Sequence, residues 1–321
     1  MVFINFPRID LDTHADLATW RTKANFTEGD WKILKEFLTE QCRFFPGIHA
    51  IHKCWYTELP QGDNYALDVE HFRPKRSARP LDAKQVNRIE KEVGYKFYQN
   101  LTSTPYPWLE FDYRNYRITT ALPNRGGAKH DFFPVAHNSS RLSTPQEPWT
   151  IREYNLLLDP VDRHDSDLLV VLPNGTILPR SPKTSLSRLE FDNYAANWQL
   201  DGFNYLRAIL TIIVYRLDDR ILVNGRKEVF SDTTESITLL LELLSVPQVS
   251  SAITNAYIEQ LIRKVLPSAP FALAARSALA SYVVPQAKEA VLKPIYQVLS
   301  STINTRLQQE MVSKVIDWTR S

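Results

Sequence analysis

Apolar residues recur at helical spacing in two widely separated parts of the chain. Near the N-terminus, the stretch TEGDWKILKEFLTEQCRFF gives a helical stripe made of Trp31, Leu34, Phe37 and Leu38. In the last third, FNYLRAILTIIVYRLDDRIL repeats this spacing on one face, with Leu206, Ile209, Leu210, Ile213 and Leu217. A later helix is predicted to begin at Asp232, because Asp232 and Glu235 have capping-box spacing. The pattern predicts a helical segment over residues 1–53 and an α-helical domain over residues 181–321.

The middle of the chain, residues 54–180, has a different pattern. Short apolar runs are interrupted by proline, aromatic and histidine residues, which is typical of short strands joined by turns. The clearest hairpin is LLVVLPNGTILPR, in which Asn174-Gly175 joins two apolar runs. In LDPVDRHD the acidic residues favour a turn over a calcium loop, because the glycine and the distal glutamate of such a loop are missing. The sequence therefore predicts a mostly helical α+β protein.

The composition excludes several classes of protein. With 44% hydrophobic residues the chain can bury a sizeable core, yet no apolar run approaches the roughly 18 residues of a membrane span. A net charge of +2 excludes a histone-like polycation but leaves room for a local basic patch. The pair Gly126-Gly127 makes neither a P-loop nor a dinucleotide fingerprint. Two cysteines form no disulfide framework and the first residues do not match a signal peptide, so a cytoplasmic location is expected.

The stretch LDVEHFRPKR is the first candidate for chemistry, because it puts Glu70 beside His71. If it is a strand, Asp68 and Glu70 share one face and His71 points to the other. A carboxylate can hold a divalent cation and a neighbouring imidazole can deprotonate water, which together are what metal-assisted phosphodiester hydrolysis needs. A strand-end histidine beside a solvated glutamate is the alternative, and for an isolated pair it is the commoner case.

The stretch YPWLEFDYRNYRITTALPNRGGAKHDFFPV is the second candidate. Its aromatic residues predict a rigid support around Asn115, whose amide could hold the backbone or imidazole of a catalytic histidine or could lie in a β-turn. Asn124 suits a helix N-cap or a neutral oxygen ligand. Lys129 would suit a phosphate, and His130 is interpreted as a surface residue in preference to a metal ligand.

Four segments together resemble a known family. In order and spacing, DVEHFRP, YPWLEFDYRNYRI, LPNRGGAKHDFFPV and NLLLDPVDRHDSDLLVVLPNGTI are similar to HNH endonucleases. The branch most like this chain is the HNH nuclease subunit of bacterial anti-phage systems of the Septu type, which also accompanies some retrons. The resemblance covers about residues 53–177 and is weaker over the helical tail. It implies a ββα-metal (HNH) nuclease module within residues 54–180, in which a β-hairpin and a helix hold one divalent ion, magnesium or manganese.

The resemblance also implies roles for four residues. His71 matches the general base, and Asn115 matches the residue that orients this base. Glu70 matches the acidic metal ligand, and Asn124 matches a second metal ligand at the third position of the motif. All four residue types are retained in this chain.

The chain departs from the family at its structural zinc site. The family has two cysteine pairs, and the matching positions here hold one cysteine, two threonines and a proline: Cys54, Thr57, Thr120 and Pro123. One thiolate cannot complete a four-ligand zinc site, so we expect no structural zinc. Packing of a cluster of aromatic residues is expected to replace it, with Trp55, Tyr56, Trp108, Phe111 and Tyr113 as members.

Basic residues next to these motifs predict binding to the phosphates of nucleic acid. They are Arg73, Lys75, Arg76, Arg125 and Lys129. Such contacts give sequence-independent, salt-sensitive affinity. The basic residues between 84 and 96 are interleaved with glutamates and are more typical of a solvated helix face.

Two hypotheses of function follow. The first is a metal-dependent HNH endonuclease, a phosphodiester hydrolase acting on DNA or tRNA in an antiviral defence system. The resemblance then implies a partner ATPase subunit, for which the helical tail offers a docking surface, and no membrane partner. The alternative is a degenerate HNH domain that binds nucleic acid or a protein partner without cutting, which the missing zinc cysteines would favour.

Overall fold

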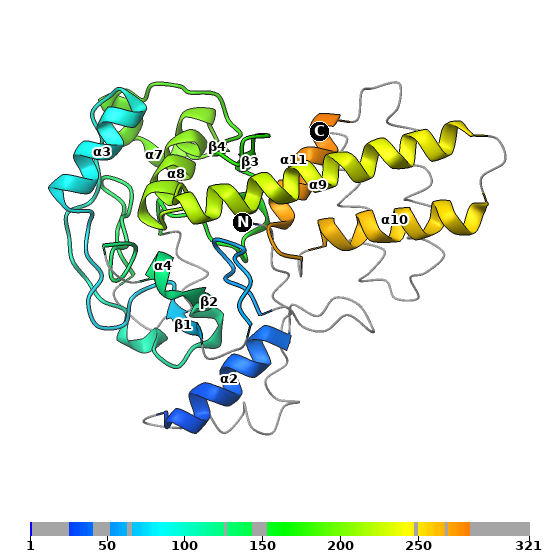
Figure 1. Cartoon of the computed structure of the whole chain (residues 1–321). Coiled ribbons are helices and arrows are strands. Elements are labelled where there is room, and N and C mark those ends of the chain that lie inside the picture. Colours follow the sequence, from blue (N-terminus) through cyan, green and yellow to red (C-terminus); the bar gives the residue numbers. More distant parts are fainter. Residues whose placement is uncertain are drawn as a thin grey trace.

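The computed structural model describes residues 1, 26–40, 52–62, 66–124, 127–142, 153–246, 250–266 and 269–282. Over these residues the protein is a mostly helical α+β structure with two small antiparallel sheets of two strands each. The predicted fold class is therefore confirmed at this level. Figure 1 shows a body that contains both sheets and an arm of long helices that extends from it. No described helix is long and apolar enough to cross a membrane.

The first sheet pairs β1 (Leu67–His71) with β2 (Tyr116–Thr120), so that Leu67 lies opposite Thr120 and His71 opposite Tyr116. The short helix α4 (Ala121–Asn124) follows β2 directly. One face of the sheet packs on α2 (Glu28–Glu40), in which Leu34 and Leu38 are fully buried. The predicted N-terminal helix is thus confirmed for this segment. Figure 1 shows α2, β1, β2 and α4 together at one end of the body.

A long connection joins β1 to β2. It contains the amphipathic helix α3 (Ala83–Val93) and two 3-10 turns, η2 (Pro107–Leu109) and η3 (Tyr113–Asn115). Asp82 caps α3 by accepting a hydrogen bond from the Gln85 backbone N–H, and Gly94 ends the helix in the left-handed region. Arg88 on the exposed side of α3 pairs with Asp218, which agrees with a solvated helix face.

The second sheet is the predicted hairpin. Its strands are β3 (Leu169–Val171) and β4 (Ile177–Pro179), and Gly175 lies between them with a φ of +84°. Asn174 stabilises the turn by accepting a hydrogen bond from the Thr176 backbone N–H. The turn touches α9 (Arg220–Ser245), because a Cβ atom on Gly175 would lie 2.0 Å from the Val223 carbonyl oxygen.

Gly175→Ala is therefore expected to destabilise the protein more than Gly127→Ala. Both glycines have a φ of +84°, which costs a residue with a Cβ about 1–2 kcal/mol. Gly127 has open space around its missing Cβ, whereas the Cβ at Gly175 would meet α9 and add about 1–3 kcal/mol of overpacking. Urea unfolding of the two variants measures the difference, and equal free energies of unfolding would show that the hairpin does not touch α9.

The C-terminal part is helical as far as it is described. Short helices α5 (Arg163–Ser166), α6 (Arg188–Asp192) and α7 (Tyr194–Asn197) precede α8 (Asp201–Val214). Residues 202–214 of α8 are all buried, so the predicted one-sided stripe underestimates how central this helix is. The prediction for residues 283–321 lies outside the described part of the chain.

The predicted helix start at Asp232 is wrong. Asp232 lies in the middle of α9, which begins at Arg220 after Asp219 caps it through the Ile221 backbone N–H. The buried face of α9 runs without interruption from Leu222 to Leu240. Continued burial on both sides of Asp232 therefore keeps the helix intact, and the capping-box spacing of Asp232 and Glu235 falls within it by chance.

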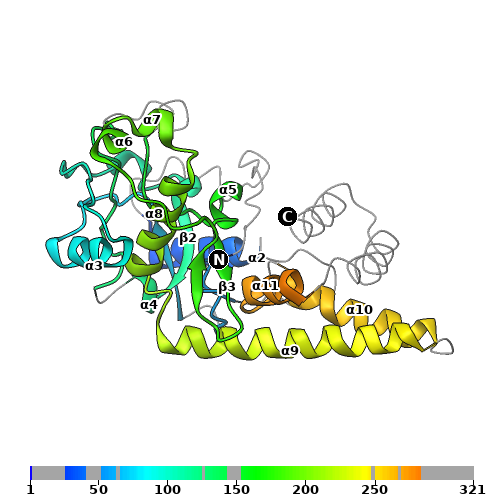
Figure 2. The same cartoon turned by 90° about the horizontal axis from the view of Figure 1, so that it is seen from above.

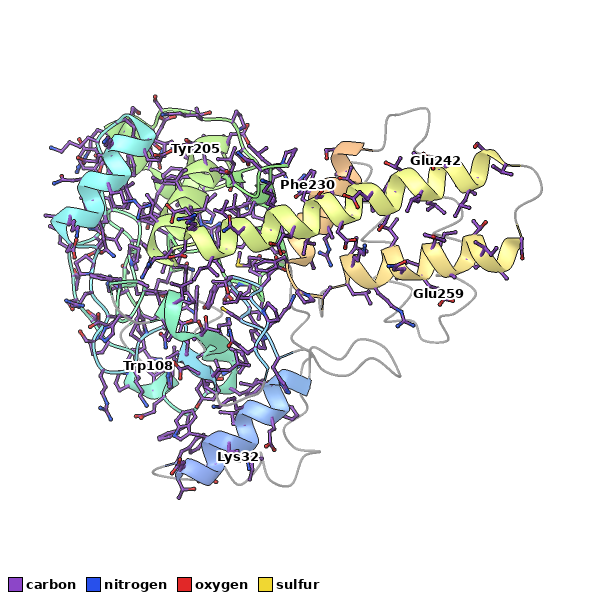
Figure 3. All side chains as sticks on the ribbon, in the orientation of Figure 1. Lys32, Trp108, Tyr205, Phe230, Glu242 and Glu259 are labelled. Atoms are coloured by element: carbon purple, nitrogen blue, oxygen red, sulfur yellow. The ribbon has the colours of Figure 1, made fainter. Side chains whose placement is uncertain are left out.

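The arm consists of the distal half of α9 and of α10 (Ser251–Val265), with α11 (Ala272–Tyr282) packed where the arm joins the body (Figures 1 and 2). Figure 3 places Glu242 and Glu259 on the part of these helices that extends away from the body. The arm has a separate apolar core, to which α9 contributes Ile237, α10 contributes Ile258 and α11 contributes Leu279. Exposed apolar side chains also occur along it, namely Leu239, Leu244, Val246 and Ile253.

Candidate functional site

β1 and α4 contribute residues to the wall of a cavity of about 480 Å³. Three of the four motif residues line this cavity: Glu70, His71 and Asn124. Two of the predicted cationic residues, Lys75 and Arg76, line it as well. The remaining lining residues are Val69, Pro74, Ser77, His130 and Asp131. Residues far apart in the sequence are thus brought to one place, although Arg125 lies outside the described residues.

His71 is held at the end of β1 by a backbone carbonyl. Its Nε2 lies 2.9 Å from the Glu110 carbonyl oxygen, which also accepts a hydrogen bond of 2.5 Å from the Tyr116 hydroxyl. The rings of Trp31 and Tyr116 meet the imidazole edge-on at centroid distances of 6.0 and 5.1 Å. The imidazole therefore has one well-defined orientation.

This arrangement sets the tautomer of His71. A carbonyl oxygen can only accept, so Nε2 carries the proton and Nδ1 keeps a free lone pair. Burial lowers the pKa of His71 from 6.5 to about 4, and the positive charges of Lys75 and Lys129 act in the same direction. At neutral pH the imidazole is therefore uncharged and can accept a proton at Nδ1, as a general base must.

Asn115 is buried and acts on the backbone that follows His71. Its Oδ1 accepts a hydrogen bond of 2.8 Å from the Arg73 N–H, and its Nδ2 donates to the Arg73 carbonyl oxygen at 2.9 Å. The Asn115 carbonyl oxygen accepts from the Phe72 N–H at 2.8 Å. The amide thus holds the backbone of Arg73, two residues beyond His71, in place of the backbone or imidazole of His71 itself.

Asn115→Asp is expected to destabilise the protein and to slow any reaction that uses His71. The new carboxylate would keep the bond to the Arg73 N–H but would face the Arg73 carbonyl oxygen, which leaves a buried acceptor unsatisfied at about 1–3 kcal/mol. Asn174→Asp is the matched control, because its turn needs only an acceptor for the Thr176 N–H. Chemical unfolding tests both, and an Asn115→Asp protein as stable as the wild type would contradict the role given to the amide.

Glu70 lies on the other face of β1, where it is buried and paired with Lys129. The Lys129 ammonium contacts Glu70 Oε1 and donates a 2.8 Å hydrogen bond to the His71 carbonyl oxygen. Burial lowers the pKa of Lys129, and the charge of Glu70 opposes this. Both Glu70 carboxylate oxygens are shielded from solvent, and neither has a hydrogen bond of good geometry among the described residues.

Glu70 and Asn124 carry the kind of oxygen atoms that bind a divalent cation. Both residues line the cavity and carry a carboxylate and an amide oxygen, respectively, and magnesium completes such sets with water and phosphate. The fold already holds one positive charge at Glu70, the ammonium of Lys129. Over the described ranges, no three His, Cys, Asp or Glu side chains come together as a metal-binding group. Glu70 and Asn124 would hold an ion here once the shielded Glu70 oxygens become accessible.

Asn124 is the last residue of α4, so the N-cap interpretation is wrong. Its Nδ2 lies 3.5 Å from Asp68 Oδ2, and its carbonyl oxygen accepts from the His130 N–H at 3.2 Å. Asn124 thus connects β1 to the loop that carries Lys129 and His130. Asn124 lines the cavity, as the metal-ligand interpretation requires.

The basic residues divide into buried and accessible ones. Arg73 is buried and its Nε donates to Glu153 at 2.8 Å, and Lys129 is fully buried, so neither reaches the surface where a phosphate arrives. Lys75 pairs with Glu110 at 2.6 Å but is partly exposed, and Arg76 is exposed. The accessible positive charge at the cavity therefore comes from Lys75 and Arg76 among the predicted set that the structure describes.

His130 and Asp131 also belong to the cavity wall. His130 is exposed, in agreement with its interpretation as a surface residue, and its Nδ1 lies 2.9 Å from Asp131 Oδ1. Asp131 also accepts from Arg79 Nε at 2.9 Å. Burial raises the pKa of Asp131, but the hydrogen bonds from Arg79 and His130 outweigh it and hold this pKa at about 2.

Two of the positions that match the family's zinc cysteines, Cys54 and Thr57, are in contact. Cys54 Sγ accepts from the Thr57 N–H at 3.4 Å and lies 3.7 Å from Thr119 Oγ1, next to Thr120 at the end of β2. The absence of a structural zinc stays a prediction. The aromatic cluster expected in its place is not one cluster, because Trp55 and Tyr113 pack beside α2 while Tyr56 and Trp108 belong to the main core.

Two groups that hold His71 could not be inferred from side-chain patterns. Glu110 acts through its backbone carbonyl, which every residue possesses, and Tyr116 reaches the same oxygen through its hydroxyl. The only available signal is the aromatic density of the YPWLEFDYRNYRI stretch, which predicts a rigid support without naming its contacts.

Comparison of the chain with models of known protein families, with curated proteins and with solved structures finds no match. The likeness to HNH endonucleases therefore depends on the four sequence segments and on the chemistry of the residues that they contain.

Proposed function

We propose that the protein is an HNH-type endonuclease, with a ββα-metal module formed by β1, β2 and α4, that hydrolyses phosphodiester bonds in DNA or tRNA. The observation that carries the proposal is His71, a neutral imidazole with a free Nδ1 lone pair at a cavity that also contains a carboxylate, an amide and accessible cations. A general base, an anion-binding surface and oxygen ligands for a metal are the parts that such hydrolysis needs.

The residues of the chain would act in the following way. His71 takes a proton from water at Nδ1, the water oxygen forms a bond to phosphorus, and one phosphorus–oxygen ester bond breaks. The Glu110 carbonyl keeps its hydrogen bond to Nε2 throughout, which stabilises the imidazolium that forms. Asn115 fixes the backbone after His71 and thereby the position of the ring. Asn115 is therefore a positioning residue.

Glu70 and Asn124 are proposed to hold a magnesium or manganese ion. When bound, such an ion stabilises negative charge on the phosphate and on the leaving oxygen. Lys75 and Arg76 are proposed to contact the phosphates on either side of the cut, because they are the accessible cations at the cavity. This attraction would weaken with added salt.

The alternative is a nucleic-acid-binding domain that does not cut. The contact between Lys129 and Glu70 favours it, because the expected metal ligand already has a cationic partner. The neutral state and fixed orientation of His71 favour the nuclease, because a binding surface has no use for a free imidazole lone pair.

Incubation of the purified protein with plasmid DNA and with total tRNA separates the two functions. Each mixture contains magnesium or manganese and is analysed both for cut products and for shifted mobility. The nuclease predicts cut products with one of the two substrates, whereas retarded but intact nucleic acid would support the binding domain.

A partner ATPase and a role in cytoplasmic anti-phage defence belong to the same proposal. The helical arm supports it, because apolar side chains such as Leu244, Val246 and Ile253 are exposed near its end. The cleavage assay is therefore performed with and without an ATPase subunit of the kind that the resemblance implies. A change in rate on its addition would support a regulatory partner.

A further inference from the structure

Lys129 is an unusual component of the candidate site, because its whole side chain is buried. Its ammonium contacts Glu70 Oε1 and donates to the His71 carbonyl oxygen. The backbone on both sides is also fixed, since the Lys129 N–H donates to the Pro123 carbonyl oxygen at 3.1 Å and the Lys129 carbonyl oxygen accepts from the Phe132 N–H at 2.7 Å. The loop therefore delivers this ammonium to the end of β1.

A buried lysine needs a compensating charge, because burial of an isolated ammonium is strongly unfavourable. Glu70 supplies that charge, and it is the same carboxylate that is proposed to bind a divalent ion. Both Glu70 oxygens are closed to solvent while Lys129 is in place. A hydrated ion therefore has no route to Glu70 in this arrangement.

We propose that the Lys129 ammonium and a divalent metal ion compete for Glu70, so that the site holds one or the other but never both. The ammonium is then a built-in cation that closes the site for as long as it contacts Glu70. This inference rests on the proposed function, because it concerns the metal site of that nuclease. It makes Lys129 a determinant of metal affinity and not a phosphate ligand.

Titration with Mn²⁺, followed through the electron paramagnetic resonance signal of the free ion, tests the competition without nucleic acid. Lys129→Gln removes the charge but keeps a donor for Glu70, and it is expected to bind Mn²⁺ at least about tenfold more tightly than the wild type. The double variant Lys129→Gln/Glu70→Gln should lose this gain, because its carboxylate is absent. Equal or weaker Mn²⁺ binding by Lys129→Gln would overturn the proposal.

A second measurement uses the wild-type protein and does not depend on the folding of a variant. Lysine acylation by an amine-reactive reagent, read by mass spectrometry of peptides, reports whether the Lys129 ammonium is accessible. Saturating Mn²⁺ should increase the acylation of Lys129 and leave the exposed Lys84 unchanged. Unchanged acylation of Lys129 would contradict the competition.

These experiments and the nuclease assay can fail independently. Tighter Mn²⁺ binding by Lys129→Gln in a protein that cuts neither DNA nor tRNA would keep the competition and reject the nuclease. If the wild-type protein cuts nucleic acid but Lys129→Gln gains no Mn²⁺ affinity, the nuclease is supported and the competition is rejected.

Discussion

Replacement of His71 by alanine is expected to reduce phosphodiester cleavage by about 10²–10⁴-fold, the usual contribution of a general base. The reason is that His71 has a free Nδ1 lone pair, and its pKa of about 4 keeps the imidazole uncharged at neutral pH. Single-turnover rates on the preferred nucleic acid measure the effect. Mobility shift should show unchanged binding, because the accessible cations Lys75 and Arg76 remain.

His130→Ala is the matched control for this prediction. His130 lines the same cavity, but its side chain is exposed and its Nδ1 is bonded to the Asp131 carboxylate. Its loss is expected to leave the rate close to that of the wild type. Equal loss of cleavage in the two variants would remove the reason to assign the base to His71.

Replacement of Arg117 by alanine is expected to lower the free energy of unfolding by about 3–5 kcal/mol, the range for a broken buried ion pair. Arg117 is buried near the start of β2, and its Nε donates to Asp159 at 2.6 Å. Its Nη1 also donates to the carbonyl oxygens of Arg114 and Tyr116, at 2.8 and 2.7 Å. The substitution would leave these acceptors unsatisfied and would detach β2 from the segment around Asp159.

Arg114→Ala gives the comparison for Arg117. Arg114 also pairs with an aspartate, Asp112, which lies only two residues before it in the chain. Because the Arg114 side chain is exposed, its removal should change the free energy of unfolding by no more than about 0.5 kcal/mol. Urea unfolding monitored by circular dichroism measures both variants. An Arg117→Ala protein as stable as Arg114→Ala would show that the Arg117–Asp159 pair does not support the site.

Local patterns predict the elements whose signals are local. The stripe of Leu34 and Leu38 marks α2, and Asn174-Gly175 marks the β3–β4 turn, because the conformations they favour require no distant partner. The helix start predicted at Asp232 is wrong, because the burial that continues α9 past Asp232 comes from α10 and α11. Tertiary packing decides that boundary.

In the candidate site, too, some features could be predicted from the sequence and others depend on distant partners. The motif spacing and the family resemblance predict that Glu70, His71 and Asn124 belong together, and they do line one cavity. The burial of Arg73 and Lys129 could not be predicted, because long cationic side chains are mostly exposed and their acidic partners lie elsewhere in the chain. The Glu110 carbonyl that holds His71 has no side-chain signature at all.

The most direct test of the nuclease is cleavage in water enriched in oxygen-18, with the wild type and His71→Ala side by side on plasmid DNA and total tRNA. Activation of water by His71 predicts that the wild type cuts one of these substrates and that one labelled oxygen enters the new terminal phosphate, while His71→Ala yields little product. Intact nucleic acid with either divalent ion, or cut products without the label, would contradict hydrolysis at this site.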